Sequence, residues 1–330
     1  MTIQDGYRTI REGAALVEDA SRARIAVSGK DRGSYLHGLL TNDIQALTAG
    51  TGCYAAWLTP QGRMMTDMHV LEAGDMILLD LPASVRELVV QRLDQYLFSE
   101  DVQLGDVTGA LRSISVHGPR AAEVIERTIA LHAGDWPQYR NVRADFSGTA
   151  VVVARIDQLG TPGFTIYVDA AREADLVIAL EQAGATRIGD DAYNAARVEA
   201  GYPLFGIDMD DDIIPLEAGI ESRAISFTKG CYVGQEVIIR VLHRGGGRVA
   251  RRLVGLRLAG GAEPPPRGAR IHAGGRDAGF VTSAAQSPRL GPIALAYVHR
   301  DFVTPGTRVE VGDARTGATV SALPFGEEEK

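Results

Sequence analysis

The feature that most constrains the fold is a pattern that occurs twice along the chain. An apolar strand that ends in glycine, at residues 25–29, is matched by residues 114–118, and a segment with helical spacing follows each copy. The two copies lie roughly 85–90 residues apart, which is too long a period for a solenoid. This order suits two similar β-α-β-β-α-β units, the ferredoxin-like arrangement. The alternative is that any two α+β stretches look alike.

The elements expected in the two units follow from apolar spacing and turn residues. The first strand of the chain is expected near Arg24, and Asp31 is expected to cap the helix after it. The first unit should continue with strands at 54–58, 64–71 and 76–81 and a helix at 84–97. The second should have strands at 114–118, 150–156 and 164–168 and helices at 119–129, 170–183 and 190–201.

The rest of the chain has a different pattern. Residues 208–226 are irregular, and glycines 245–247 are expected to form a flexible joint. Short strand candidates lie at 253–258, 279–283, 293–298 and 307–311, and prolines and glycines separate them. This spacing predicts a small antiparallel barrel or sandwich, with a frayed tail at 326–330. The predicted fold is therefore α+β, divided into residues 1–110, 111–245 and 246–330.

Charge and cysteine content exclude several classes of function. The chain of 330 residues has a net charge of −8, so coating nucleic acid or an anionic membrane over its whole surface is not expected. Its two cysteines, Cys53 and Cys231, form neither a disulfide framework nor a cysteine metal site. No signal pattern and no apolar run near the roughly 20 residues of a membrane span is present. We expect a cytoplasmic protein with no metal site and no membrane association.

Three polar residues before residue 200 are candidates for binding or chemistry. Asp67 would lie within a strand just after a tight turn, where an aspartate needs a ligand or an inter-strand partner. Arg197 and Glu199 would lie at the end of a helix. A carboxylate there can accept two N–H groups from an aminopyrimidine edge. On the residues alone, a solvated helix end is the favoured alternative.

Two further candidates lie after residue 228. Cys231 stands beside Lys229, which can lower a thiol pKa and make a nucleophile or redox group, although a lone cysteine is more often a small apolar residue. A basic cluster at 240–252 could bind a phosphate, a polycarboxylate tail or RNA. A solvated linker face is its alternative. The cluster consists of Arg240, His243, Arg244, Arg248, Arg251 and Arg252.

Residues 229–236, with the sequence KGCYVGQE, resemble the signature of the YgfZ family of folate-binding proteins. That family is related to the glycine-cleavage T-protein, an aminomethyltransferase. Residues 35–43, 62–67 and 197–206 resemble segments of the same superfamily, and the region after Gly247 resembles its C-terminal barrel. The resemblance implies three subdomains in a ring, with tetrahydrofolate or a related reduced folate in the central hole.

The resemblance also implies roles for particular residues. Glu199 would hold the pterin edge and Asp67 would lie near folate N5. Cys231, Lys229 and Asp67 are the catalytic candidates. The folate-binding candidates are Glu199, Asp67, Asn42, Arg197, Tyr232, Lys229 and Arg223.

The implied function is maturation or repair of iron–sulfur proteins, and indirectly tRNA modification, with iron–sulfur client or assembly proteins as partners. One alternative is an aminomethyltransferase-type enzyme that transfers one-carbon units with tetrahydrofolate. Another is an RNA- or protein-binding module that uses residues 240–252, although the acidity of the chain argues against direct nucleic-acid binding. T-protein has a longer N-terminal region and lacks the lysine–cysteine signature, so whether the chain is an enzyme is left open.

Overall fold

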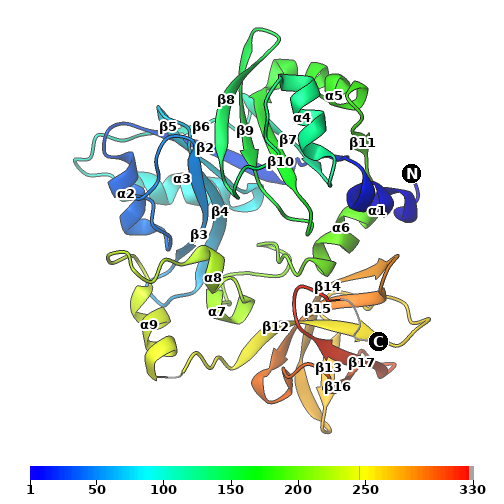
Figure 1. Cartoon of the computed structure of the whole chain (residues 1–330). Coiled ribbons are helices and arrows are strands. Elements are labelled where there is room, and N and C mark those ends of the chain that lie inside the picture. The colour runs from blue at the N-terminus through cyan, green and yellow to red at the C-terminus, as the bar shows by residue number, and fades with distance from the viewer. Residues whose placement is uncertain (245, 327–330) are drawn as a thin grey trace.

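The segment from Arg22 to Asp106 forms an antiparallel sheet with helices on one face (Figure 1). The computed structural model describes residues 1–244 and 246–326. The five strands have the order β3-β4-β5-β2-β6, which is the ferredoxin-like order with β3 added at one edge. The elements are β2 (Arg22–Ser28), α2 (Arg32–Leu39), β3 (Thr51–Leu58), β4 (Met64–Glu72), β5 (Met76–Pro82), α3 (Arg86–Gln95) and β6 (Gln103–Asp106).

The segment from Leu111 to Arg187 repeats this arrangement and confirms the duplication. Its sheet has the order β11-β1-β7-β10-β9-β8, which matches the first sheet except that β1 lies between β11 and β7. In both sheets alternate apolar side chains pack against two helices, because successive side chains of a strand point to opposite faces. The elements are β7 (Leu111–His117), α4 (Ala121–Ile129), β8 (Asn141–Phe146), β9 (Thr149–Arg155), β10 (Gly163–Asp169), α5 (Glu173–Gln182) and β11 (Thr186–Arg187).

The N-terminal segment differs from expectation. It forms α1 (Ile3–Glu12) and β1 (Ala15–Glu18), so the prediction of a first strand near Arg24 is wrong. A strand of four residues is too short to show a period in the sequence, and β1 is held by pairing with β7 and β11. The N-terminal segment therefore joins the second sheet, and the division at residue 110 stays a prediction. Asp31 is the N-cap residue of α2, as expected, but its carboxylate makes no capping hydrogen bond and accepts instead from the backbone N–H of Asp101 at 2.8 Å.

The C-terminal part forms a closed barrel with the strand order β12-β15-β14-β13-β16-β17. It contains two more strands than the sequence predicts, β13 and β17. Gly245, one residue of the predicted joint, and residues 327–330 of the predicted tail lie outside the described residues. The strands are β12 (Arg251–Leu258), β13 (Arg270–Ala273), β14 (Arg276–Ser287), β15 (Gly291–His299), β16 (Arg308–Val311) and β17 (Thr316–Ser321).

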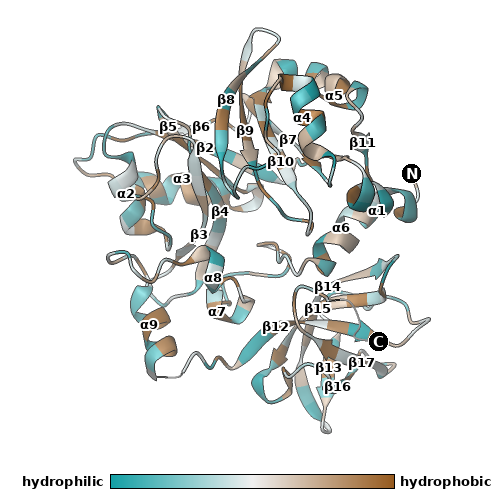
Figure 2. Ribbon diagram, viewed as in Figure 1, coloured by the Kyte–Doolittle hydropathy of each residue, from teal (hydrophilic) through white to brown (hydrophobic). Residues whose placement is uncertain are grey.

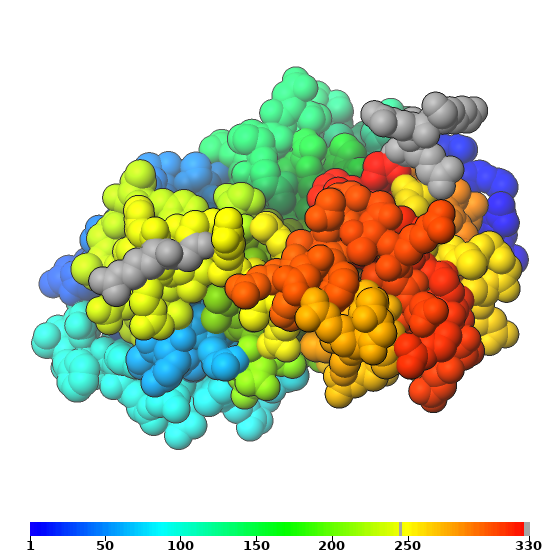
Figure 3. Space-filling model, turned by 90° about the horizontal axis from the view of Figure 1, so that it is seen from below, coloured from blue at the N-terminus to red at the C-terminus, as the bar shows by residue number. Residues whose placement is uncertain are grey.

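Four helices connect the second sheet to the barrel: α6 (Asp190–Glu199), α7 (Pro215–Ala218), α8 (Glu221–Ala224) and α9 (Gln235–Arg244). Short 3-10 turns lie at Ala83–Val85, Ala170–Arg172 and Arg300–Phe302. In Figures 1 and 3 the barrel lies beside the segment that carries α7–α9, and α8 contacts β3 while α7 contacts β12. Figure 2 shows hydrophobic and hydrophilic residues side by side on α9. In the described chain, no helix has the length and apolarity to cross a membrane.

The interior of the second sheet contains a histidine that makes stability depend on pH. His117 is fully buried, and burial lowers its pKa from 6.5 to about 4. The unfolded chain takes up a proton below pH 6.5, whereas the folded chain does so only near pH 4. Stability should therefore fall by about 3 kcal/mol across that window as the pH is lowered. Thermal unfolding of His117→Met should show a weaker loss of Tm from pH 7 to pH 5 than wild type; equal losses would contradict this.

Candidate functional site

The centre of the candidate site is the buried carboxylate of Asp67. Tyr54, Asp67 and His69 lie on one face of the first sheet, opposite the face that α2 and α3 cover. The Tyr54 hydroxyl donates a hydrogen bond of 2.5 Å to Oδ2 of Asp67. Oδ1 of Asp67 is buried and has no hydrogen-bond partner in the described part of the chain. Such an atom calls for a donor from a ligand or an ordered water.

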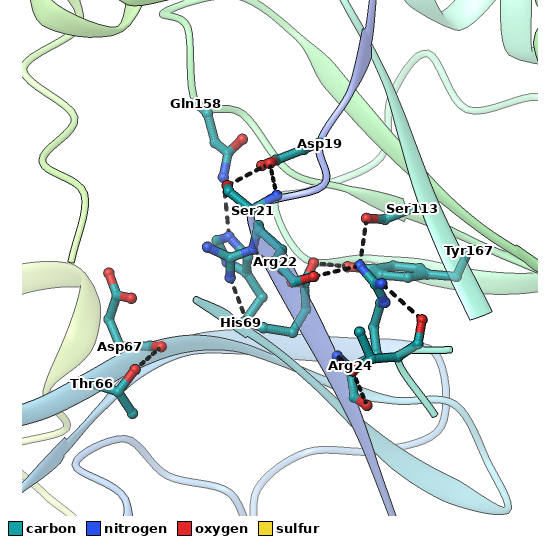
Figure 4. A network of polar contacts seen from close by, with 12 residues as sticks. Asp19, Ser21, Arg22, Arg24, Thr66, Asp67, His69, Ser113, Gln158 and Tyr167 are labelled. Atoms are coloured by element: carbon teal, nitrogen blue, oxygen red, sulfur yellow. Dashed lines mark hydrogen bonds and ion pairs between the residues drawn. The ribbon is translucent and has the colours of Figure 1, made fainter. Parts of the chain in front are cut away.

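The charge state of Asp67 is set by its surroundings. Burial raises the pKa of its carboxyl, and Arg22, the Tyr54 hydrogen bond and Arg223 oppose that rise. Figure 4 shows Asp67 apart from the network around Arg22 and Tyr167, with its carboxylate directed away from them. A buried carboxyl with a raised pKa is better matched to proton exchange near neutral pH than a solvated aspartate.

Arg223 places a positive charge beside this carboxylate. Its guanidinium carbon lies 4.1 Å from the ring centroid of Tyr202 and 4.8 Å from that of Tyr54. The half-buried Arg223 also lines a cleft of about 660 Å³ between α7–α8 and the barrel. Arg223 therefore extends from an open cleft to the buried tyrosines. Its contact with folate stays a prediction, and its position is suited to such a contact.

Asn42 fixes two of these residues through their backbones. Its side-chain Nδ2 donates to the main-chain oxygens of Tyr54 at 2.8 Å and Arg223 at 3.1 Å. The amide thereby ties β3 to α8 beside the site. The predicted contact of Asn42 with folate stays a prediction, and the structure gives its amide nitrogen a positioning role.

Lys229 holds the chain that follows α2. Its Nζ donates to the main-chain oxygens of His37 at 2.5 Å, Leu40 at 2.6 Å and Asn42 at 2.9 Å. An ammonium has three N–H groups, so all of them are used. Burial lowers the pKa of Lys229 to about 8, which leaves it protonated at neutral pH. Its link to Asp67 runs through Asn42 and Tyr54.

The neighbours of Lys229 in the signature face different surroundings. Cys231 is exposed and free. Tyr232 is buried, and its ring centroid lies 5.2 Å from Nζ of Lys229. Cys53, on β3, is half-buried, and burial raises the pKa of its thiol to about 12. The roles predicted for Cys231 and Tyr232 stay predictions, and an exposed Cys231 is accessible to a partner.

Replacing Lys229 with methionine should lower stability, because three backbone oxygens at the end of α2 lose a charged donor. We expect a loss of about 2 kcal/mol in the free energy of unfolding, measured by urea denaturation. Lys30→Met, at an exposed position, is the matched control and should change it by less than about 0.5 kcal/mol. Unfolding of both variants at the same urea concentration would refute the role given to Lys229.

Glu199 lies apart, at the end of α6, and its carboxylate is already bonded. Oε2 accepts from Tyr7 at 2.8 Å, Arg11 at 3.0 Å and Arg289 at 3.1 Å, while Oε1 accepts from Ser287. Glu199 is buried and lines a second cleft, of about 640 Å³. A pterin contact at Glu199 stays a prediction, and such a contact would have to share this carboxylate with four side chains.

Arg197 is a structural ion-pair partner in this arrangement. Its Nη1 lies 2.7 Å from Oδ2 of Asp208, and both side chains are at most 2% exposed. Its Nη2 donates to Asn194 at 2.7 Å and to Ser283, on the barrel, at 2.8 Å. Arg197 therefore joins α6 to the barrel with nitrogens that point away from open space. A folate contact at this residue remains untested.

The basic cluster at 240–252 is divided by the fold. Nε of Arg251 lies 3.4 Å from Oε1 of Glu217, and Nη2 of Arg252 lies 3.0 Å from Oε1 of Glu221. Arg240 and Arg248 are exposed. Two of the predicted cations are thus used in packing α7 and α8 against the barrel, which weakens the case for an RNA-binding face. Nucleic-acid binding remains untested.

The arrangement of two similar sheets and a barrel can be compared with known proteins. Residues 1–229 match the family described as GCVT N-terminal domain, and residues 251–326 match the glycine cleavage T-protein C-terminal barrel domain. The chain belongs to the glycine cleavage T-protein (GcvT) family. The second match agrees with the barrel predicted from the sequence.

Individual relatives agree with this assignment. The GcvT-family chain is 30% identical to an aminomethyltransferase of Rubrobacter xylanophilus, over 98% of this chain and 86% of the relative. It is 29% identical to an aminomethyltransferase of Nostoc sp., over 92% and 82%. The crystal structure of glycine cleavage system aminomethyltransferase T from Bartonella henselae matches with a TM-score of 0.87 and 23% identity, over 99% and 90%. That likeness shows the fold alone, and membership of the YgfZ branch stays a prediction.

Four residues of the candidate site were not predicted from the sequence: Tyr54, His69, Tyr202 and Gln158. Tyr54 bonds to Asp67, Tyr202 packs on Arg223, and Gln158 bonds to His69. The sequence held one signal for His69: it follows Asp67 by two residues on the same strand, so the two side chains share a face of the sheet. Within residues 1–244 and 246–326, no three His, Cys, Asp or Glu side chains are grouped so as to hold a metal ion.

Proposed function

We propose that the chain binds a reduced folate at the buried polar centre around Asp67 and uses it to transfer one-carbon units of the aminomethyl type. The observation that carries the proposal is the unpartnered Oδ1 of Asp67, buried beside two tyrosines and an arginine. Membership of the GcvT family and kinship with aminomethyltransferases support it. We further propose that the protein acts in the cytoplasm.

The residues present fit a pterin ring. A flat heterocycle with N–H groups and a carbonyl needs aromatic surfaces and at least one buried acceptor. Tyr54 and Tyr202 supply aromatic rings, and Asp67 supplies the acceptor. Arg223 can meet an anionic tail from its place on the cleft.

Each residue of the centre then has a role in transfer. A bound tetrahydrofolate would supply the nitrogen that accepts the one-carbon unit. Asp67 orients that nitrogen and takes up or returns its proton, helped by the raised carboxyl pKa. The Tyr54 hydroxyl fixes the rotamer of the carboxylate through Oδ2, and Arg223 keeps the site electrically balanced.

The test is turnover of an aminomethyl-lipoyl carrier protein with tetrahydrofolate. The proposal expects release of ammonia and formation of methylene-tetrahydrofolate at a rate above that of the mixture without protein. If folate binds but no product forms with any aminomethyl-carrying substrate, transfer is excluded and binding alone remains.

The second candidate function is a folate-dependent role in maturing or repairing iron–sulfur proteins. The signature at 229–236 favours it, since Lys229 anchors the loop while Cys231 is exposed to a partner. A maturation-deficient strain should recover iron–sulfur enzyme activity with the wild-type chain and lose most of that recovery with Cys231→Ala. Full recovery with the variant would remove Cys231 from this function.

A further inference from the structure

A second buried polar group lies next to Asp67 on β4 and has no role so far: His69. The two residues are separated by one position, so their side chains share a face of the sheet with Cα atoms about 7 Å apart. His69 is 2% exposed. Its ring centroid lies 5.7 Å from those of both Tyr54 and Tyr139, so the imidazole is enclosed by aromatic rings.

The position of the proton on this imidazole follows from the hydrogen bond at its Nε2. Nε2 of His69 lies 3.1 Å from the amide Nε2 of Gln158, on the turn between β9 and β10 (Figure 4). An amide nitrogen donates, so Nε2 of His69 accepts. Burial, with the charges of Arg22 and Arg223, lowers the pKa of His69 well below its ordinary value, so the ring is neutral. Its proton is then on Nδ1.

Nδ1 of His69 is buried and has no acceptor among the described residues, as Oδ1 of Asp67 has no donor. One strand thus presents an unpaired N–H and an unpaired carboxylate oxygen on the same face. A buried polar atom without a partner costs stability, so each of these two atoms calls for a partner from an ordered water or from a ligand. The pattern is complementary to a group that carries an acceptor beside a donor.

We propose that His69 is a ligand-binding residue whose Nδ1–H donates to a ring carbonyl oxygen of the ligand, while an N–H next to that carbonyl donates to Oδ1 of Asp67. The inference rests on the proposed function and specifies the edge of the ligand that this face recognises. A reduced pterin carries such an edge, because its C4 carbonyl is flanked by ring N–H groups. A pterin with an amino group at C4 would instead turn an N–H toward His69.

Calorimetric titration with two ligands tests this contact: tetrahydrofolate, and its analogue in which an amino group replaces the C4 carbonyl. Wild type should bind tetrahydrofolate at least about 10-fold more tightly than the analogue, because the analogue sets donor against donor. His69→Phe should bind tetrahydrofolate about 10- to 100-fold more weakly than wild type. Its preference for the carbonyl form should fall to less than about threefold.

Two variants control the experiment. His69→Gln keeps an N–H donor and should recover part of the preference, which a purely structural role would not predict. His132→Phe, at an exposed position, should bind both ligands as wild type does. The inference is overturned if His69→Phe binds tetrahydrofolate and discriminates as wild type does. Failure of wild type to bind tetrahydrofolate at all is a separate result that overturns the proposed function as well.

Discussion

Replacing Asp67 with asparagine should reduce the rate of one-carbon transfer by about 100- to 10,000-fold, the usual range for a lost acid–base group. The same change should raise the Tm of the unliganded protein at pH 7. Burial raises the folded-state pKa of Asp67 above its unfolded value, so the stability of wild type falls as the pH rises through that range. Asparagine keeps an oxygen for Tyr54 and carries no charge, so it avoids this loss.

Steady-state kinetics and thermal unfolding over a pH series measure the two effects on the same protein. The gain in Tm should shrink as the pH falls toward the ordinary aspartate pKa of 3.8, because the raised pKa of Asp67 lets the folded chain take up this proton before the unfolded chain does. Asp313→Asn, at an exposed position of the barrel, is the matched control and should leave rate and Tm unchanged. An Asp67→Asn protein that transfers at the wild-type rate would refute the assignment of the site.

Arg197→Met should give the largest loss of stability, about 3–5 kcal/mol in the free energy of unfolding, because it leaves the buried charge of Asp208 uncompensated. The affinity for tetrahydrofolate of the folded fraction should stay within about twofold of wild type, since the Arg197 nitrogens bond within the protein. Urea denaturation and calorimetry on one preparation separate the two quantities.

The double variant Arg197→Met/Asp208→Asn tests the cause of that loss. It should recover part of the stability, because no unpaired charge remains while Thr282 keeps an acceptor. Arg308→Met, at an exposed arginine, serves as the control for the side-chain change itself and should cost less than about 0.5 kcal/mol. A stable Arg197→Met protein that has lost folate binding would show instead that Arg197 contacts the ligand.

The features that were predicted from the sequence are those that local patterns encode. The strands β2 to β5, β7, β9 and β10 and the helices α2 to α5 were predictable from apolar spacing, because each unit repeats the same order of elements. The strands β1, β6, β8 and β11 were not predicted, and β1, β6 and β11, with four, four and two residues, are too short to show a period. All four form because backbone groups of neighbouring strands pair with them.

The residues of the candidate site also divide into those that the local sequence indicates and those that only the fold brings together. Asp67 stood out because an aspartate inside a strand needs a partner. Arg197 and Glu199 looked alike as polar residues on one helix end. Only their partners in the fold, Asp208 and the barrel residues Ser283 and Ser287, distinguish their roles. His69 was overlooked because a single histidine in an apolar strand resembles a core residue, and its partner Gln158 lies on a turn between two strands of the other sheet.

The central claim is that a reduced folate binds at the Asp67 centre, and calorimetric titration of the wild-type chain with tetrahydrofolate tests it most directly. We expect one saturable site per chain with a dissociation constant on the order of micromolar or tighter. Binding should be weaker in Asp67→Asn and unchanged in Asp313→Asn. The absence of saturable heat up to about 1 mM, together with no rise in Tm at that concentration, would contradict it.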